Sequence, residues 1–320
     1  MSEWRPSARI TMLRRRAAML AGLRAFFAER DVMEVETPLL SAFGATAPHL
    51  DSFTTVFRAP GAPDGQTLYL QTSPEYAMKR LLAAGSGPIY QITKAFRNGE
   101  TGHCHNPEFT LLEWYRPNVD YHALMAEVDE LLQRLLGTAP AQRLSYGEAF
   151  AAQLHIDPHT APPSALRRCA RAHLNAPPDP GDDRDTWLSL LWTHLIEPQL
   201  GHDRPVFIHD YPVSQAMLAR VRSGTPPVAE RFEAYIKGVE LANGFQELQD
   251  PEEQGRRFEA DVRRRAALGL PAMAPDARLL TALKRLPICS GVALGVDRLL
   301  LVKSDARDLA QVLSFAVDRA

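Results

Sequence analysis

The sequence predicts an α+β fold in which helices flank a mostly antiparallel β-sheet. Helical and strand patterns follow one another in blocks, without the regular strand–helix–strand alternation of a parallel sheet. Two pairs of strand candidates also follow each other with no helix between them, around 98–108 and around Lys237 and Gly238. Antiparallel neighbours need only a turn or loop, whereas parallel neighbours need a long crossover connection.

In the first part of the chain we expect a helix, a strand, and a strand followed by a helix. Apolar residues recur near helical spacing over 12–28, which predicts an amphipathic helix. Segment 32–40 is expected to form a strand that is stopped at Pro38. Segment 69–85 reads as a strand and then a helix, with Ser73 as N-cap and Pro74 as the first helical residue. The apolar positions of the first helix are Leu13, Ala17, Leu20 and Phe27.

The later elements are predicted from hydrophobic periodicity and from capping residues. We find no internal repeat and no linker, so we expect one domain. The elements are strands over 89–97, 109–116 and 205–212, a helix over 121–136 closed by Gly137, a hairpin that begins at 231, a helix opened by Asp250 and Glu253, and a glycine-rich strand over 290–298 that runs into the last helix.

Composition is that of an ordinary globular protein. The 320 residues carry a net charge of −2, which gives no support to a surface that coats nucleic acid. No apolar run reaches the length of a membrane span, and the first residues lack the hydrophobic core of a signal peptide. The three cysteines show no metal-ligand spacing, and their sparseness suits a reducing compartment. We therefore expect a cytoplasmic protein with no membrane partner.

The stretch FRNGETGHCHNPEFTLLEWY, residues 96–115, carries the clearest chemical signal. Strand alternation from Phe109 places Phe109, Glu113 and Tyr115 on one face. Arg97 ends the preceding strand, and its planar guanidinium suits a phosphate. Phe109 could stack on a base, and the loop between the strands is long enough to fold over a ligand. Taken alone, a solvated loop with a structural ion pair explains the stretch equally well.

A second stretch brings carboxylates together. A two-residue turn at Lys237 and Gly238 would pair Tyr235 with Glu240, and alternation then places Glu233 and Glu240 on one face. Two carboxylates on one face repel each other unless a cation lies between them, and Mg²⁺ with substrate phosphates is a common solution. The simpler interpretation is that one glutamate is exposed to solvent.

Two further stretches are weaker by themselves. SGVALGVDR, residues 290–298, would place Arg298 at a helix N-terminus, where anions bind favourably. A structural arginine is the simpler explanation. Glu75 follows a strand end in TSPEYAMKRL, where it also complements the positive end of the helix dipole.

Together these stretches resemble the catalytic domain of class II aminoacyl-tRNA synthetases of the lysyl type. EVETP (34–38) resembles motif 1, FRN…HNPEFTLLEWY resembles motif 2, and GVALGVDR resembles motif 3. TSPEYAMKRL and VELANGFQEL are similar to the amino-acid-binding segments of the lysyl enzymes. The resemblance implies one catalytic domain over residues 1–320, and a homodimer formed through motif 1.

Within this class the chain looks most similar to the family of elongation factor P lysine ligases, which are truncated paralogues. The first predicted helix begins within about a dozen residues of Met1, so we expect no anticodon-binding OB-fold before it. The resemblance implies activation of (R)-β-lysine by ATP and transfer of the β-lysyl group to a lysine of elongation factor P. It also implies that no tRNA anticodon is recognised.

The resemblance implies a role for each matching residue. Arg97 would hold the α-phosphate, and Phe109 and Arg298 would sandwich the adenine, with Arg298 also reaching the γ-phosphate. These two arginines would be the catalytic residues. The ATP site would comprise Arg97, Asn98, Glu100, His105, Phe109, Glu240 and Arg298; the Mg²⁺ site Glu233 and Glu240; and the amino-acid site Ser73, Glu75, Glu113, Tyr115, Asn243, Glu247 and Ala293.

Two positions depart from the lysyl pattern. Gly99 stands where motif 2 usually has a glutamate that reads the adenine amino group, and Glu100 follows it directly. Ala293 stands where lysyl-tRNA synthetases have glycine. The additional methyl group narrows the pocket wall, which suits an amino acid whose amine is displaced by one carbon.

Three alternatives remain at this point. A lysyl-tRNA synthetase would charge tRNA, and a related ligase would act on a small-molecule acceptor. An inactive paralogue would serve as a binding module, for which Gly99 gives some support. Retention of Arg97 and Arg298 opposes the last alternative. We also expect the loop over 98–108 to become ordered when ATP binds.

Overall fold

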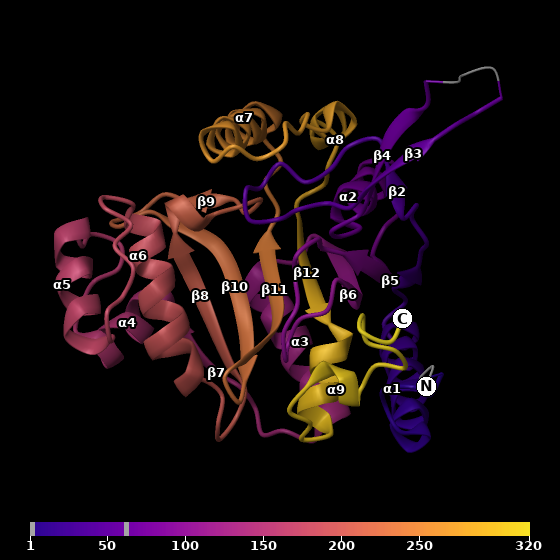
Figure 1. Cartoon of the computed structure of the whole chain (residues 1–320), viewed down its shortest axis with the longest axis horizontal. Coiled ribbons are helices and arrows are strands. Elements are labelled where there is room, and N and C mark those ends of the chain that lie inside the picture. The colour runs from indigo at the N-terminus through magenta and orange to yellow at the C-terminus, as the bar shows by residue number, and fades with distance from the viewer. Residues whose placement is uncertain (1–3, 61–63) are drawn as a thin grey trace. The chain divides into compact units, whose positions relative to one another are not determined.

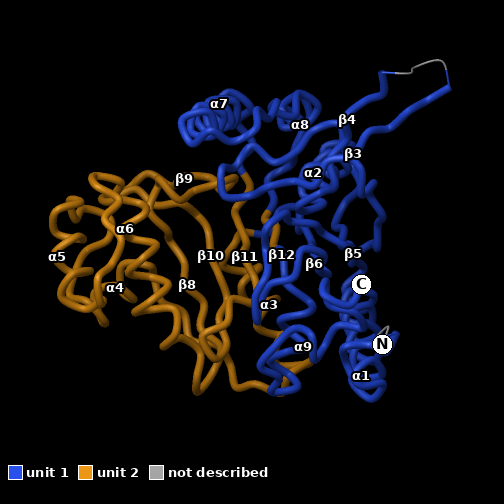
Figure 2. Tube along the Cα trace, in the orientation of Figure 1, with its two compact units in different colours: residues 1–119, 248–289, 293–320 blue, residues 120–247, 290–292 orange. Residues whose placement is uncertain are grey.

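The computed structural model describes residues 4–60 and 64–320, and the chain divides into two compact units (Figure 2). Unit 1 comprises Met1–Val119, Leu248–Cys289 and Ala293–Ala320, and unit 2 comprises Asp120–Glu247 and Ser290–Val292. The expectation of a single domain over 1–320 stays a prediction. Each unit is described separately below.

Unit 1 combines three paired strands, β1, β5 and β6, with a small second sheet and several helices (Figure 1). Strand β5 pairs in parallel with β1 and antiparallel with β6, and the small sheet has the order β2-β4-β3. The elements are α1 (Ile10–Ala28), β1 (Met33–Glu34), β2 (Leu40–Ser41), β3 (Thr54–Phe57), β4 (Gln66–Leu70), α2 (Glu75–Ala83), β5 (Ile89–Phe96), β6 (Glu108–Pro117), α7 (Pro251–Ala267), α8 (Ala277–Leu283), α9 (Val296–Lys303) and the short helix η4 (Leu309–Gln311). Strand β12 (Cys289–Gly295) contributes residues to both units.

Helix α1 buries a different face from the one predicted. Its buried residues are Met19, Leu23, Phe26 and Phe27, whereas Leu13, Ala17 and Leu20 are only partly covered or exposed. The reason lies in what the helix packs against. The Phe27 ring stacks on Tyr90 of β5 with 4.4 Å between ring centroids, and it meets Trp114 of β6 edge-on at 5.3 Å. Aromatic contacts of this kind contribute more than small aliphatic residues at the same spacing.

Two other predicted elements need correction. Only Met33–Glu34 of segment 32–40 pairs with β5, and Leu40–Ser41 joins the small sheet instead. Pro38 lies between them and cannot donate a ladder hydrogen bond. The N-cap of α2 is Pro74 rather than Ser73. The Ser73 hydroxyl nevertheless accepts a hydrogen bond from the Glu75 N–H at 3.0 Å, so it still satisfies a donor of the first turn.

Unit 2 contains an antiparallel set of strands and a group of helices around one aromatic core. Strand β10 pairs antiparallel with β8, β9 and β11, and β7 pairs in parallel with β8. The Tyr146 ring stacks on Trp192 at 4.7 Å and lies 4.8 Å from Tyr211. The elements are α3 (Tyr121–Leu136), β7 (Gln142–Ser145), α4 (Tyr146–Leu154), α5 (Pro163–His173), α6 (Arg184–Leu191), η1 (Trp192–Ile196), η2 (Glu197–Gln199), β8 (Val206–Pro212), η3 (Val213–Gln215), β9 (Val221–Arg222), β10 (Val228–Ile236) and β11 (Val239–Gln246).

The hairpin of β10 and β11 has the predicted turn. Tyr235 lies opposite Glu240, and Lys237 and Gly238 both have positive φ, as a tight hairpin turn requires. A register irregularity between Ala234 and Tyr235 then shifts the pairing, so that Glu233 lies opposite Asn243. A bulge of this kind re-aims side chains and is not visible in strand alternation.

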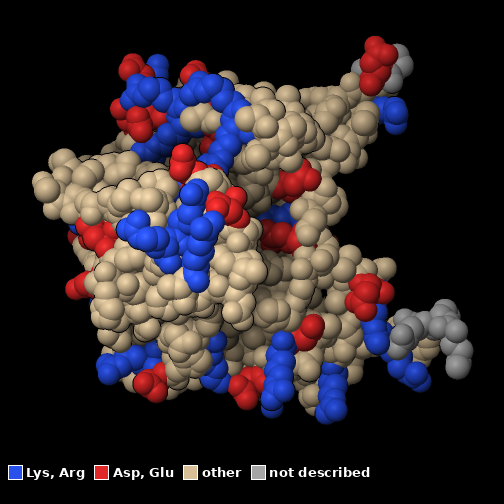
Figure 3. All heavy atoms as spheres, turned by 60° about the vertical axis from the view of Figure 1, so that its left-hand side comes forward, with Lys and Arg blue, Asp and Glu red and all other residues tan. Residues whose placement is uncertain are grey.

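The structure confirms the predicted α+β class with a mostly antiparallel sheet. Acidic and basic side chains are intermixed on the face shown in Figure 3, as expected for a small net charge. Within residues 4–60 and 64–320, no helix combines the length and apolar character needed to cross a membrane.

Candidate active site

Residues 98–108 form a loop that is closed at its base and turned at its tip. The Arg97 N–H donates to the Pro107 carbonyl at 2.9 Å, which continues the pairing of β5 and β6 past the strand ends. At the tip, Gly102 and His105 exchange two backbone hydrogen bonds of 3.1 and 3.2 Å. Gly102 and Gly99 both have positive φ, which glycine adopts without strain. The local sequence therefore shapes a hairpin-like loop.

Arg97 lies at the base of this loop beside the predicted base-stacking residue. Its guanidinium carbon lies 5.0 Å from the centroid of the Phe109 ring, and its Nη1 lies 3.5 Å from Glu100 Oε1. Its Nε is buried and has no hydrogen-bond partner among residues 4–60 and 64–320. Leaving a buried charged donor unsatisfied is costly. Arg97 is therefore suited to an anionic ligand.

Arg298 reaches the same loop from the first turn of α9. Its Nε donates to the Cys104 carbonyl at 3.2 Å, and its Nη2 lies 2.8 Å from His105 Nε2. Arginine can only donate, so His105 Nε2 accepts and the imidazole is neutral in this contact. Burial lowers the pKa of His105 and the charge of Arg298 lowers it further; Glu100 opposes this shift, and Arg97 adds a smaller lowering effect. The charges of the two predicted catalytic arginines thus both lower the pKa of His105.

The start of α9 is held by Asp297, which the sequence analysis did not single out. Its buried carboxylate accepts from the Thr110 N–H of β6 at 2.8 Å and from Arg16 of α1 at 2.5 Å. Arg16 also donates to the Thr110 hydroxyl at 2.7 Å. Helix α9, and with it Arg298, is therefore tied to the strand that carries Phe109.

The predicted amino-acid-binding residues of unit 1 form one hydrogen-bonded cluster. The carboxylate of Glu113 is buried and accepts from the Ser73 hydroxyl at 2.6 Å and from the Tyr115 hydroxyl at 3.2 Å. Burial, and then the nearby charge of Glu75, raise the pKa of Glu113 to about 8. Glu75 in turn accepts from the buried Lys79 ammonium at 2.6 Å.

This cluster favours a cationic ligand. Two carboxylates close together in a buried site resist ionisation, and an ammonium placed between them removes the penalty. Arg97 already acts in this sense, because its charge lowers the pKa of Glu113. Lys79 was missed in the sequence, although it lies four residues after Glu75, where helical side chains meet.

In unit 2, Glu233 is held by three donors. Arg231 forms an ion pair with its Oε1, and the hydroxyls of Tyr211 and Tyr235 donate to its Oε2, at 2.6 Å for Tyr211. Arg231 Nε also donates to Asn243 Oδ1 at 3.2 Å. Arg231 therefore links two predicted site residues. Alternation with Glu233 places Arg231 on the same face, a signal that the sequence analysis did not use.

The remaining predicted residues have these places. Glu240 is half-buried on β11, and Glu247 is buried just after β11, where it forms a bridge with Ala219. Ala293 is half-buried on β12. The side-chain Nδ2 of Asn98 donates to Asp51 Oδ2 at 2.7 Å, so this side chain is hydrogen-bonded within the protein. Among the described residues, no three or more His, Cys, Asp or Glu side chains are grouped to hold a metal ion.

Comparison with known proteins gives a match over the whole chain. The family model for tRNA synthetases class II (D, K and N) matches residues 3–319. Two curated relatives, from Yersinia pestis (strain Pestoides F) and Yersinia pseudotuberculosis serotype O:1b (strain IP 31758), are each named elongation factor P–(R)-β-lysine ligase. Each is 54% identical over 321 residues, covering 100% of this chain and 99% of the relative.

Proposed function

Because the chain belongs to the class II tRNA synthetase family (D, K and N), we propose that it is an ATP-dependent ligase that attaches (R)-β-lysine to a lysine of elongation factor P. The resemblance drawn from the motifs is confirmed by 54% identity over the full length to ligases of that name. Use of ATP follows from the class.

The proposal depends on one observation, that two arginines and a buried glutamate lie close together within unit 1. Arg97 and Arg298 both act on His105 of the loop, and Arg97 also lies close enough to Glu113 to lower its pKa. An arginine suited to a phosphate thus lies near a carboxylate suited to a cation, which supports adjacent sites for the two. Activation of a diamino acid by ATP requires this combination, because the substrate brings two ammonium groups and one carboxylate to a triphosphate.

In the first step, the carboxylate oxygen of β-lysine attacks the α-phosphorus of ATP. A new O–P bond forms, the bond from the α-phosphorus to the bridging oxygen breaks, and pyrophosphate leaves with its electrons. The nucleophile is already ionised, so no general base is needed. Arg97 holds the α-phosphate and Arg298 the γ-phosphate, and their charges stabilise the transition state.

In the second step, the amine of the acceptor lysine attacks the carbonyl carbon of the adenylate. An amide bond forms and AMP leaves. The acceptor must lose a proton to become nucleophilic, and Glu75, Glu113 and Tyr115 orient the two ammonium groups of the β-lysyl moiety meanwhile. Ser73, Asn243, Glu247 and Ala293 complete the amino-acid site, and Asn98, Glu100, His105 and Phe109 complete the ATP site.

Mg²⁺ belongs to the proposal through Glu233 and Glu240. A carboxylate offers about four acceptor positions, and Arg231, Tyr211 and Tyr235 use three of those on Glu233. One position on Glu233 therefore fits a cation ligand, together with the half-buried Glu240. A bound Mg²⁺ would neutralise phosphate charge as it does in other phosphoryl-transfer sites.

A homodimer formed through the motif 1 segment is also proposed. The residues that flank this segment include Met33, Leu39 and Leu40, with 50%, 40% and 44% of their surface accessible. Neighbouring exposed apolar residues of this size mark interaction surfaces. Sedimentation of the purified protein as a monomer at all concentrations would remove this part of the proposal. A cytoplasmic location stays a prediction from the sparse cysteines.

The test offers labelled (R)-β-lysine and ATP with elongation factor P and with tRNA in parallel. The proposal expects pyrophosphate exchange that depends on β-lysine, and label on elongation factor P alone. Label on tRNA would assign the chain to the tRNA-charging enzymes. Absence of exchange with β-lysine and with α-lysine would instead favour an inactive binding module, the alternative for which Gly99 gives some support.

A further inference from the structure

The C-terminal segment, residues 309–320, contacts the 98–108 loop at two points. The Leu309 N–H donates to the His103 carbonyl at 2.9 Å, and the Val317 N–H donates to the Asn106 side-chain Oδ1 at 3.1 Å. His103 and Asn106 flank Cys104 and His105, which Arg298 contacts. The segment 309–320 therefore holds the same stretch of loop on which the catalytic arginine acts.

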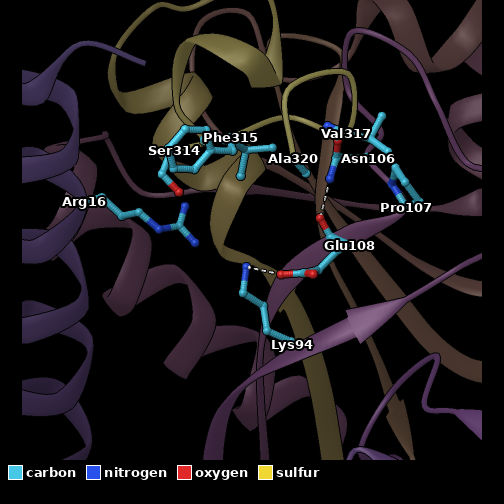
Figure 4. Close-up of a pocket in the computed structure, with 10 residues that line it drawn as sticks. Arg16, Lys94, Asn106, Pro107, Glu108, Ser314, Phe315, Val317 and Ala320 are labelled. Atoms are coloured by element: carbon cyan, nitrogen blue, oxygen red, sulfur yellow. Dashed lines mark hydrogen bonds and ion pairs between the residues drawn. The ribbon is translucent and has the colours of Figure 1, made fainter. Parts of the chain in front are cut away.

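The side chain of Asn106 links the C-terminal segment to strand β6. It is 8% exposed, and its Nδ2 donates to the Glu108 carbonyl at 2.6 Å, where β6 begins. Figure 4 shows Asn106 and Val317 side by side at a pocket of about 310 Å³, with Glu108 below them. One carboxamide thus joins the C-terminal segment to the strand that carries Phe109, using both its donor and its acceptor.

The C-terminal segment is itself fixed, so it can serve as an anchor. The residues before α1 pair with it: the Ser7 N–H donates to the Ser314 carbonyl at 2.7 Å, and the Ala8 N–H to the Leu313 carbonyl at 3.1 Å. The Ala316 N–H donates to the Ser7 hydroxyl at 3.0 Å. A segment held along its length loses little further entropy when it orders a neighbouring loop.

We propose that segment 309–320 is a clamp that fixes loop residues 103–106 before ATP binds, with Asn106 as the positioning residue through which it acts. The consequence for catalysis rests on the proposed function, because it requires that this loop bind ATP. A loop fixed beforehand loses less entropy on binding, so the clamp tightens ATP binding more than it speeds the chemical step. Ordering on ATP binding is then confined to residues 99–102.

The sharpest variant removes one donor and leaves the fold intact. Val317 occupies the second position of a turn closed by the Arg319 N–H and the Ala316 carbonyl at 2.8 Å, and proline is favoured at that position. Val317→Pro deletes the N–H that Asn106 accepts. Val317→Ala keeps it and removes a comparable amount of side chain, which makes it the matched control. Val317 is 51% exposed, so neither change opens a core cavity.

Hydrogen exchange of loop amides without nucleotide tests the clamp independently of catalysis. Val317→Pro should speed exchange over residues 103–106 about fivefold, the size expected for loss of one hydrogen bond, while Val317→Ala matches wild type. Asn106→Ala, which also loses the bond to the Glu108 carbonyl, should speed exchange at least as much, and adding Val317→Pro to it should change nothing further. Equal protection in Val317→Pro and wild type, or additive effects of the two changes, would overturn the proposal.

The kinetic measurement uses pyrophosphate exchange by the full chain. Val317→Pro should raise the KM for ATP about fivefold with kcat nearly unchanged, whereas general unfolding would lower kcat. A fall in kcat at constant KM contradicts the clamp. If wild type shows no exchange with any amino acid, the proposed function fails, and the hydrogen-exchange result still decides whether the segment fixes the loop.

Discussion

The buried Nε of Arg97 has no hydrogen-bond partner among the described residues, and the guanidinium carbon lies 5.0 Å from the centroid of the Phe109 ring. An anion bound by Arg97 would therefore lie beside an aromatic ring that could stack on a base. We predict that Arg97→Ala lowers kcat/KM for ATP in pyrophosphate exchange about 100-fold, since a charge-assisted contact contributes roughly 1.5–3 kcal/mol. Arg97→Lys should recover little, because lysine lacks the planar fork.

The control for this prediction is Arg24→Ala. Arg24 is an exposed residue of α1 whose Nε lies 3.1 Å from Glu34 Oε1. Exposed ion pairs contribute little, so this change should leave exchange kinetics as they are. Equal losses in Arg97→Ala and Arg24→Ala, or full activity of Arg97→Lys, would contradict the role given to Arg97.

Glu113 makes substrate binding depend on pH. With a pKa of about 8 it is mostly protonated at pH 7 in the free protein, and an ammonium beside it would favour the ionised form. We predict that β-lysine binding at pH 7 releases close to one proton. Calorimetric titrations in two buffers of different ionisation enthalpy measure this directly. Heats that do not change with the buffer, or proton uptake, would contradict it.

Glu113 also makes the free energy of unfolding depend on pH. The folded-state pKa is raised above the unfolded value of 4.5, so the protein binds more protons than the unfolded chain between pH 4.5 and about 8. The contribution of Glu113 to stability is therefore full below pH 4.5 and is lost as pH rises through 8. Glu113→Gln mimics the protonated form, so its free energy of unfolding should not fall in this way while its β-lysine binding weakens.

Ala293 bears on the choice of amino acid. In the proposed amino-acid site the methyl group of Ala293 would narrow the wall, so Ala293→Gly should raise kcat/KM for α-lysine relative to β-lysine by several fold. Pyrophosphate exchange with each amino acid gives the ratio. Ala293→Ser, which keeps a similar volume, is the control. An unchanged ratio in Ala293→Gly would remove the residue from specificity.

Among the helices and strands, those with a strong local sequence pattern were predicted correctly. The two strands that carry the predicted site, β5 and β6, are rich in β-branched and aromatic residues, and α3 is closed by Gly137, which is left-handed in the structure. The turn at Lys237 and Gly238 was predicted because turn chemistry and register are linked. These features depend on neighbours in sequence.

The mistaken elements depend on distant neighbours. Helix α1 turns Phe27 toward Tyr90 and Trp114, two residues that lie far from it in the sequence and so leave no local signal. The short pairing of β1 depends on which strand lies beside it. The bulge that places Glu233 opposite Asn243 likewise has no local signal.

Helix α7 gives a test at this scale. The Asp250 carboxylate accepts from the N–H groups of Glu252 at 2.8 Å and Glu253 at 3.1 Å. Asp250→Ala should lower the free energy of unfolding by about 1 kcal/mol, measured by urea denaturation. Asp250→Asn keeps the capping oxygen and should lie near wild type. An Asn variant as unstable as the Ala variant would show that charge, and not capping, is responsible.

For the molecule as a whole, the sequence predicted most of the residue groups but few of their partners. Ser73, Glu113 and Tyr115 do form one cluster, and both arginines do reach the 98–108 loop. The counter-ions were missed, because Lys79 and Arg231 show their importance only through burial beside a carboxylate. Burial of a charged side chain such as Lys79 depends on the fold and leaves no pattern in the neighbouring residues.

The central claim is that Arg97 and Arg298 hold one triphosphate. A crystal structure of the protein with a non-hydrolysable ATP analogue tests it most directly. The account predicts that both guanidinium groups lie within hydrogen-bonding distance of phosphates of the same nucleotide, with the adenine on the ring of Phe109. A nucleotide that contacts neither arginine, or arginines that point into separate cavities, would contradict it.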